Sequence, residues 1–190
     1  MQENGWSLVL DPEVAHPDRE EAWDELCLWV RRPVIEYLRR NLRGFREPER
    51  VADDLLEEVQ IEYEGSGEQE LRLRACIAAA LRKLELEHAV DEEFDRDWAS
   101  SLLRAALQEM KGALPRTYAL LLRLYDSPEG DEAKLAAKLE MPLEDVHDQL
   151  VEGRAELQQR FLDEVRKTVA DPEMAAAEAA HLLVYTRKMF

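Results

Sequence analysis

Acidic side chains recur at a regular spacing in the last third of the chain. The stretch EMPLEDVHDQLVEGRAELQQRF, residues 140–161, carries four of them: Glu144, Asp148, Glu152 and Glu156. A spacing of four places these carboxylates on one outer face of a helix, while Val146, Leu150 and Leu157 form a separate apolar stripe. Such a face can bind basic groups by charge, so its chemistry is that of recognition.

The remaining reactive side chains do not form a catalytic or metal-binding arrangement. Neighbouring acids such as Asp53 and Asp54 point to different sides of a helix, and no nucleophile with a base or glycine-rich phosphate loop is present. Cys27 and Cys76 lie far apart and outside any CxxC pattern, so buried thiols are the simpler interpretation. The four histidines are scattered: His16, His88, His147 and His181. We therefore expect no enzyme, no metal and no cofactor.

Composition predicts an all-α protein with an acidic surface. The 190 residues are 46% hydrophobic and 35% charged, with 7 glycines and 8 prolines, and no segment shows the alternation typical of strands. No apolar run approaches the roughly 20 residues of a membrane span, so we expect a cytoplasmic protein. The formal charge of −17 requires any contact with DNA to be local. Solubility alone could also explain that charge.

The elements that position these residues are expected to be helices throughout. Pro33 should break or kink the first long helix, Pro48 should open the second, and Asp171 with Pro172 should cap the last. The expected helices cover residues 19–44, 48–64, 68–88, 98–126 with a break near Gly112–Pro115, 131–140, 143–169 and 171–190. The pair 131–140 and 143–169 has the pattern of a helix-turn-helix.

The expected division is into two small helical domains and a tail. A compact three-helix unit covers residues 1–88, a short acidic linker covers 89–97, and a helix-turn-helix domain covers 98–171. Residues 172–190 form a C-terminal helix, whose apolar end around Leu182 should pack on the second domain or belong to a partner-binding site.

The order of several motifs resembles the extracytoplasmic-function type of RNA polymerase sigma factor. RRPVIEYLRR and VADDLLEEVQ precede the acidic linker, and ALPRTYALLLRLYDSPEG and AKLAAKLEMPLEDVHDQLVEGRAEL follow it. WSLVL, FDRDWASSLLRAAL and the stretch from DEVRKTVADPEM to HLL are similar to one large branch of that family. The resemblance spans nearly the whole chain and identifies the two domains with sigma regions 2 and 4.

The resemblance implies partners and the residues that bind them. VADDLLEEV matches the helix with which the family docks on core RNA polymerase, and its matching residues are Asp54, Leu55, Glu58 and Val59. Carboxylates suit that role because they form charge-assisted pairs with arginine. The positions left for promoter DNA are Arg72, Arg74, Arg82, Lys83, Lys134, Lys138, His147, Gln149 and Arg154. An anti-sigma-type protein is the expected regulatory partner.

Two departures from the family pattern leave the function open. No aromatic residue lies between Tyr63 and Phe94, where the family stacks an unpaired promoter base, and Arg154 alone keeps a permanent positive charge among the recognition-helix positions. Glu140 also stands where a glycine is usual in the turn. The first hypothesis is a working sigma factor that directs polymerase to promoters. The second is a degenerate sigma-like interaction protein with weak or no specific DNA binding, either a polymerase-binding regulator or part of a defence-linked signalling complex. The third is an acidic mimic of DNA.

Overall fold

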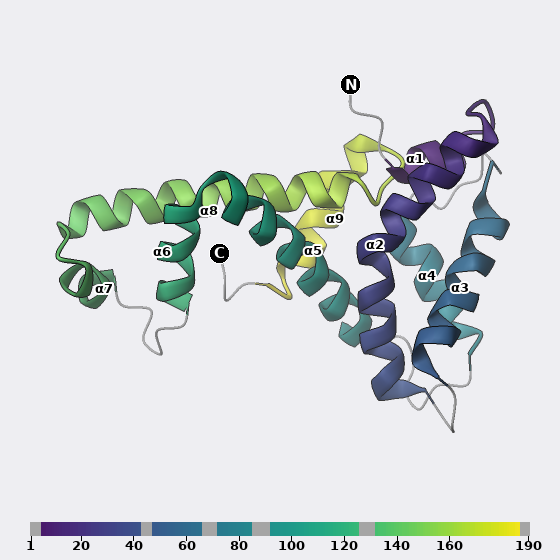
Figure 1. Ribbon diagram of the computed structural model, residues 1–190, viewed down its shortest axis with the longest axis horizontal. Coiled ribbons are helices and arrows are strands. Elements are labelled where there is room, and N and C mark those ends of the chain that lie inside the picture. The colour runs from purple at the N-terminus through teal and green to yellow at the C-terminus, as the bar shows by residue number, and fades with distance from the viewer. Residues whose placement is uncertain (1–4, 43–46, 66–71, 85–91, 126–131, 187–190) are drawn as a thin grey trace.

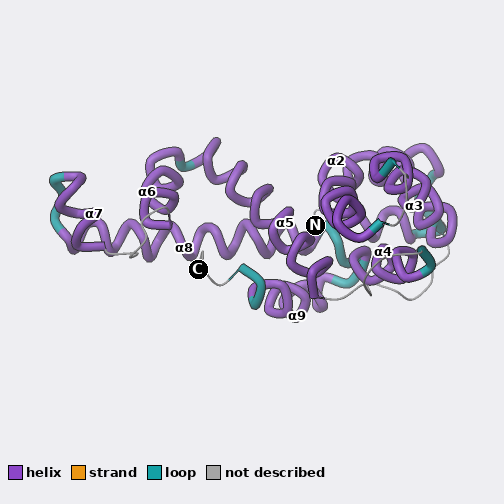
Figure 2. The backbone as a smooth tube through the Cα atoms, turned by 90° about the horizontal axis from the view of Figure 1, so that it is seen from below, coloured by secondary structure: helices purple, strands orange, loops and turns teal. Residues whose placement is uncertain are grey.

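The computed structural model describes residues 5–42, 47–65, 72–84, 92–125 and 132–186. Within those ranges it contains helices, turns and one isolated bridge but no strand, which confirms the predicted all-helical fold there (Figures 1 and 2). The helices are α1 (Gly5–Leu10), α2 (His16–Asn41), α3 (Pro48–Tyr63), α4 (Leu73–Arg82), α5 (Glu92–Ala113), α6 (Pro115–Tyr125), α7 (Glu132–Leu139), α8 (Leu143–Arg166) and α9 (Pro172–Leu183).

Helices α1 to α4 form a bundle at one end of the molecule (Figure 1). Helix α2 packs against α1 and α3, and α3 packs against α4. The indole of Trp6 lies 6.2 Å from that of Trp23 and 6.1 Å from the ring of Tyr63, measured between ring centroids. This aromatic group joins α1, α2 and α3 because each helix turns an apolar stripe toward the others.

Of the two outcomes expected at Pro33, a break or a kink, the break is wrong, because α2 continues through this residue from His16 to Asn41. Proline inside a helix costs a backbone hydrogen bond. Here Pro33 is buried together with Val30 and Val34. Packing on three neighbouring helices offsets the local cost, which sequence propensity alone does not register.

Helix α5 occupies the position of the expected acidic linker. Residues 89–91 lie outside the described residues, and residues 92–97 form the first turns of α5. Phe94 is 0% exposed and meets Tyr37 of α2 edge-on at 5.5 Å between ring centroids. Because α5 packs on both α2 and α8, apolar contacts continue across this segment. The division into two domains stays a prediction.

The other end of the molecule consists of α6, α7 and the N-terminal half of α8 (Figure 1). Helix α8 runs from there to the middle of the molecule, where α9 packs on α8 and α5, as expected for the tail (Figure 2). The Asp171 carboxylate accepts a 2.9 Å hydrogen bond from the backbone N–H of Glu173, which confirms the predicted cap of α9.

The segment that follows α8 touches the first bundle through its backbone. The N–H of Trp6 donates to the carbonyl of Lys167 at 3.2 Å, and the N–H of Leu73 donates to that of Thr168 at 2.9 Å. These bonds join the start of α1 and the start of α4 to the end of α8. They place residues far apart in the sequence beside one another.

Candidate functional site

Helix α3 separates the four predicted docking residues onto two sides. Leu55 and Val59 are buried against the neighbouring helices, whereas Asp54 and Glu58 are exposed. The two pairs keep the same spacing of four residues, so each pair shares one side of the helix. The apolar pair fixes the helix in the bundle and the acidic pair faces outward, as a docking helix requires.

Glu58 is already in contact with a predicted DNA-binding residue. The ammonium of Lys83 lies 2.8 Å from the Glu58 carboxylate and 3.2 Å from that of Glu62. Hydrogen bonds to both acids raise the pKa of Lys83. All three side chains are exposed, so this contact is weak and a partner could displace it.

Arg74 is placed for structure rather than for contact with phosphate. Its side chain is 12% exposed, and its guanidinium lies 2.6 Å from Glu178 of α9 and 2.5 Å from Asp95 of α5. Burial lowers the pKa of Arg74, but hydrogen bonds to Glu178 and the nearby carboxylates outweigh that effect and raise it. His181 lies 2.8 Å from the other oxygen of Asp95. The cluster links α4, α5 and α9.

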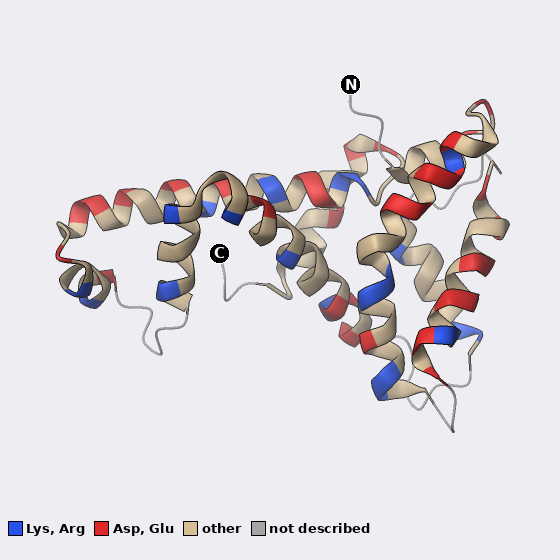
Figure 3. Cartoon of the chain, in the orientation of Figure 1, with Lys and Arg blue, Asp and Glu red and all other residues tan. Residues whose placement is uncertain are grey.

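The other predicted DNA-binding positions form two groups at opposite ends of the molecule. Arg72 precedes α4, where it forms an isolated bridge with Val169, and Arg82 and Lys83 are exposed at the end of that helix. Lys134 and Lys138 are exposed on α7, which lies at the far end (Figures 1 and 3). The structure therefore does not bring the predicted basic residues together on one surface.

Helices α7 and α8, joined by the short turn at residues 140–142, occupy the positions expected for the two helices of a helix-turn-helix. Glu140 in the turn has a φ of 53°, a left-handed conformation that glycine adopts at lower cost. Val146, Leu150 and Leu157 are buried, which confirms the predicted apolar stripe. This apolar stripe faces the neighbouring helices, so the opposite face of α8 points to solvent.

Gly153 permits α6 to approach α8 closely. A Cβ atom built at this position would lie 2.6 Å from the methyl group of Thr117 and 3.3 Å from a methyl group of Leu121, both on α6. No real side chain tolerates the first of these distances. Sequence reasoning missed this residue, although a glycine inside a long helical pattern is a signal of close packing.

The acidic face of α8 is exposed for most of its length (Figure 3). Among the residues that the structure describes, Glu144, Asp148 and Glu152 have no basic partner within ion-pair distance. Glu156 differs, since Arg160 lies 2.6 Å from its carboxylate. The outward surface of the second helix of the motif is therefore negative.

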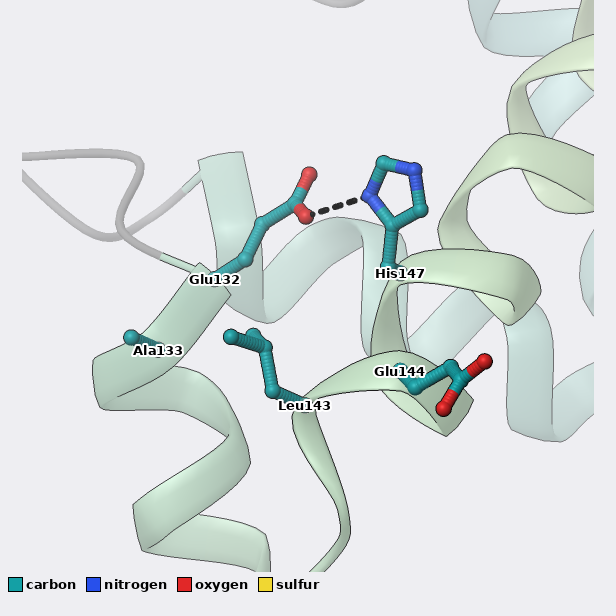
Figure 4. A pocket seen from close by; sticks show the side chains of 5 residues that line it. All are labelled: Glu132, Ala133, Leu143, Glu144 and His147. Carbon is teal, nitrogen blue, oxygen red and sulfur yellow. Dashed lines mark hydrogen bonds and ion pairs between the residues drawn. The ribbon is translucent and has the colours of Figure 1, made fainter.

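Glu132 at the start of α7 contacts two of the predicted DNA-binding residues of α8. Its carboxylate lies 2.9 Å from the Nδ1 atom of His147 (Figure 4). The guanidinium of Arg154 lies 3.5 Å from the same carboxylate. Gln149, the remaining predicted contact on α8, is half-buried. Sequence reasoning did not single out Glu132, because its role depends on how α7 packs beside α8.

A shallow hollow opens beside this contact. It has a volume of about 560 Å³ and is lined by Glu132, Ala133, Leu143, Glu144 and His147. Figure 4 shows the side chain of Leu143 pointing toward Ala133, so the floor is apolar. This apolar floor makes the hollow suited to an apolar side chain, and Glu132 and Glu144 complete its lining.

The described residues contain no group of three His, Cys, Asp or Glu side chains arranged to hold a metal ion. Cys27 and Cys76 are not joined in a disulfide, and burial raises the pKa of Cys27 to about 12. None of the described helices combines the length and the apolar character that crossing a membrane requires.

No protein-family model, no curated protein and no solved structure matches this chain.

Proposed function

We propose that this chain is a sigma-factor-like transcription initiation protein that binds core RNA polymerase through α3 and directs it to promoters. The observation that carries the proposal is the two-sided character of α3, where Leu55 and Val59 are buried while Asp54 and Glu58 are exposed. The helix-turn-helix of α7 and α8 is a second feature in favour. The protein then acts in the cytoplasm, where polymerase is found, under an anti-sigma-type partner, and no catalytic role is assigned to it.

The docking test is a charge reversal on α3. Asp54→Arg combined with Glu58→Arg should abolish capture of purified core RNA polymerase, because the contact relies on carboxylates that meet basic groups. Glu21→Arg with Glu25→Arg is the matched control, since these acids are exposed on α2 at the same spacing. The control pair should bind as the unaltered chain does. Equal binding by both pairs would remove α3 from the proposal.

A second candidate function is favoured by the contacts of Glu132. With His147 and Arg154 directed to that carboxylate and an acidic face beside them, α8 offers little to phosphate. On this account the chain is a sigma-like interaction protein, a polymerase-binding regulator or a component of a defence-linked complex, with weak or no specific DNA binding.

Sequencing the DNA that co-purifies with the polymerase complex separates the two candidates. A defined promoter set supports the sigma factor, and Arg154→Ala should then reduce its recovery with a shallow dependence on salt. Polymerase recovered without specific DNA supports the interaction protein instead. Failure to recover polymerase would contradict the sigma factor and the polymerase-binding regulator, and would leave the component of a defence-linked complex.

A further inference from the structure

Two parallel rows of side chains cover the outer surface of α8. Leu143, His147 and Val151 form the first row at intervals of four residues, and the acids Glu144, Asp148 and Glu152 form the second row beside it. Leu143 is 51% exposed and Val151 is 49% exposed, although both are large and apolar. The surface therefore combines uncovered apolar area with unpaired negative charge, and we call it the α8 face.

The charges of the α8 face are not explained by the stability of the helix alone. Glu144 lies in the first turn, where the helix dipole favours an acid. Asp148 and Glu152 lie beyond that turn, and like charges four residues apart disfavour a helix by roughly 0.2–0.5 kcal/mol per pair. A bound cation on each acid would relieve this repulsion.

We propose that the α8 face is the docking site for a basic amphipathic helix of a partner protein. Lysines or arginines at a spacing of four on that helix would match the acidic row, because both rows have the same helical repeat. Apolar residues on the neighbouring row would cover Val151 and enter the hollow between Leu143 and Ala133. This inference goes beyond the proposed polymerase contact and does not depend on it.

Charge decides against the other occupants of this face. A nucleic acid would bring phosphates against three unpaired carboxylates. A second copy of this chain could offer the arginines around the exposed Leu28 of α2, but Arg31 already bonds to Asp53 at 2.6 Å and Arg32 to Glu36 at 2.9 Å. A chain with a net charge of −17 would in contrast attract a basic partner from a distance.

The test uses a synthetic helical peptide of about four turns as the probe, with lysines on one row and leucines on the next. The fluorescence anisotropy of the labelled peptide measures its binding to the full chain. A peptide with glutamates in place of the lysines is the control for the probe. Removing three charges with Glu144→Gln, Asp148→Asn and Glu152→Gln should weaken binding by about tenfold or more. Val151→Ser should weaken peptide binding several-fold at every salt concentration, because the contact that Val151 makes is apolar and is not screened by salt.

The matched control removes three charges from an exposed part of α2, with Glu21→Gln, Asp24→Asn and Glu25→Gln. It should change binding by less than about twofold, since its acids do not line the face. Equal weakening by the two triple variants would overturn the proposal in favour of unspecific attraction. The proposal would also be overturned if the unaltered chain bound the lysine peptide no better than the glutamate peptide. It would be overturned as well if duplex DNA competed with the peptide for the α8 face, or if the unaltered chain formed an oligomer that the α8 triple variant did not form.

Discussion

Glu140 holds a backbone conformation that suits glycine better. With a φ of 53° it lies in the left-handed region, which costs a residue with a Cβ atom roughly 1–2 kcal/mol. Glu140→Gly should therefore raise the free energy of unfolding by about 1 kcal/mol, measured by urea denaturation. A gain would show that the strain is real and is kept for some reason other than stability.

The control for Glu140 is the same chemical change at a helical position. Glu152→Gly removes an equal charge from the interior of α8, where glycine lowers the free energy of unfolding by roughly 0.5–1 kcal/mol. The two variants should thus move the urea midpoint in opposite directions. A loss in both would contradict the left-handed turn at Glu140.

At the scale of the elements, the crossing of α6 over α8 depends on one missing side chain. Gly153→Ala would push a methyl group to 2.6 Å from Thr117, so it should lower the free energy of unfolding by roughly 1–3 kcal/mol. Thr117→Ser removes the opposing methyl group and should restore most of that loss in the double variant. Thermal and urea unfolding of the four chains would measure the coupling.

Gly112 in α5 supplies the contrast to Gly153. A Cβ atom at Gly112 would meet nothing within 4 Å, so Gly112→Ala should stabilise the chain by roughly 0.5–1 kcal/mol through helix propensity. If Gly153→Ala were as benign as Gly112→Ala, α6 would not lie against α8 at the distance described.

Elements with a local chemical signal could be predicted from the sequence. Pro48 opens α3, Asp171 caps α9, and a break between α5 and α6 lies beside Pro115, because each effect involves only near neighbours in the chain. The continuity of α2 through Pro33 could not be predicted, since packing on other helices decides it. The positions at which helices begin and end thus follow mostly from local chemistry. Exceptions arise where tertiary contacts outweigh the local preference.

The candidate sites were predictable only in part for the same reason. The periodicity of α8 predicts its buried and exposed sides correctly. Glu178, one of the two partners of Arg74, is 104 residues away in the chain, and Glu132, the partner of His147, is 15 residues away. Contacts of this kind depend on helix packing, so the sequence does not show that acids lie within ion-pair distance of Arg74 and Arg154.

At the scale of the whole molecule, one apolar cluster extends from Trp6 of α1 to Leu182 of α9. Helix α5 contacts the first bundle through Phe94 and also packs on α8, and α8 packs in turn on α6 and α7. A chain packed in this way should unfold in a single step. Two independent domains divided near residues 89–97 should instead unfold in two.

Tryptophan fluorescence and circular dichroism can distinguish these outcomes. All four tryptophans lie in α1, α2 and α5, while circular dichroism reports every helix. We expect both signals to change at the same urea concentration. A dichroism transition separate from the fluorescence transition would show that the helix-turn-helix end unfolds by itself, as the two-domain division predicts.

Because the cluster around Arg74 links α4, α5 and α9, cooperative unfolding of the chain should depend on the carboxylate of Glu178 on α9. Glu178 is 4% exposed, and Glu178→Gln would leave the buried guanidinium with Asp95 as its remaining charged contact. Loss of a buried charged partner costs roughly 1–3 kcal/mol, so both the fluorescence and the dichroism midpoints should fall together. Glu173→Gln, on the exposed first turn of the same helix, should leave them nearly unchanged. If Glu178→Gln lowered neither midpoint, α9 would not hold α4 and α5 together, and the tail could be displaced without loss of the fold.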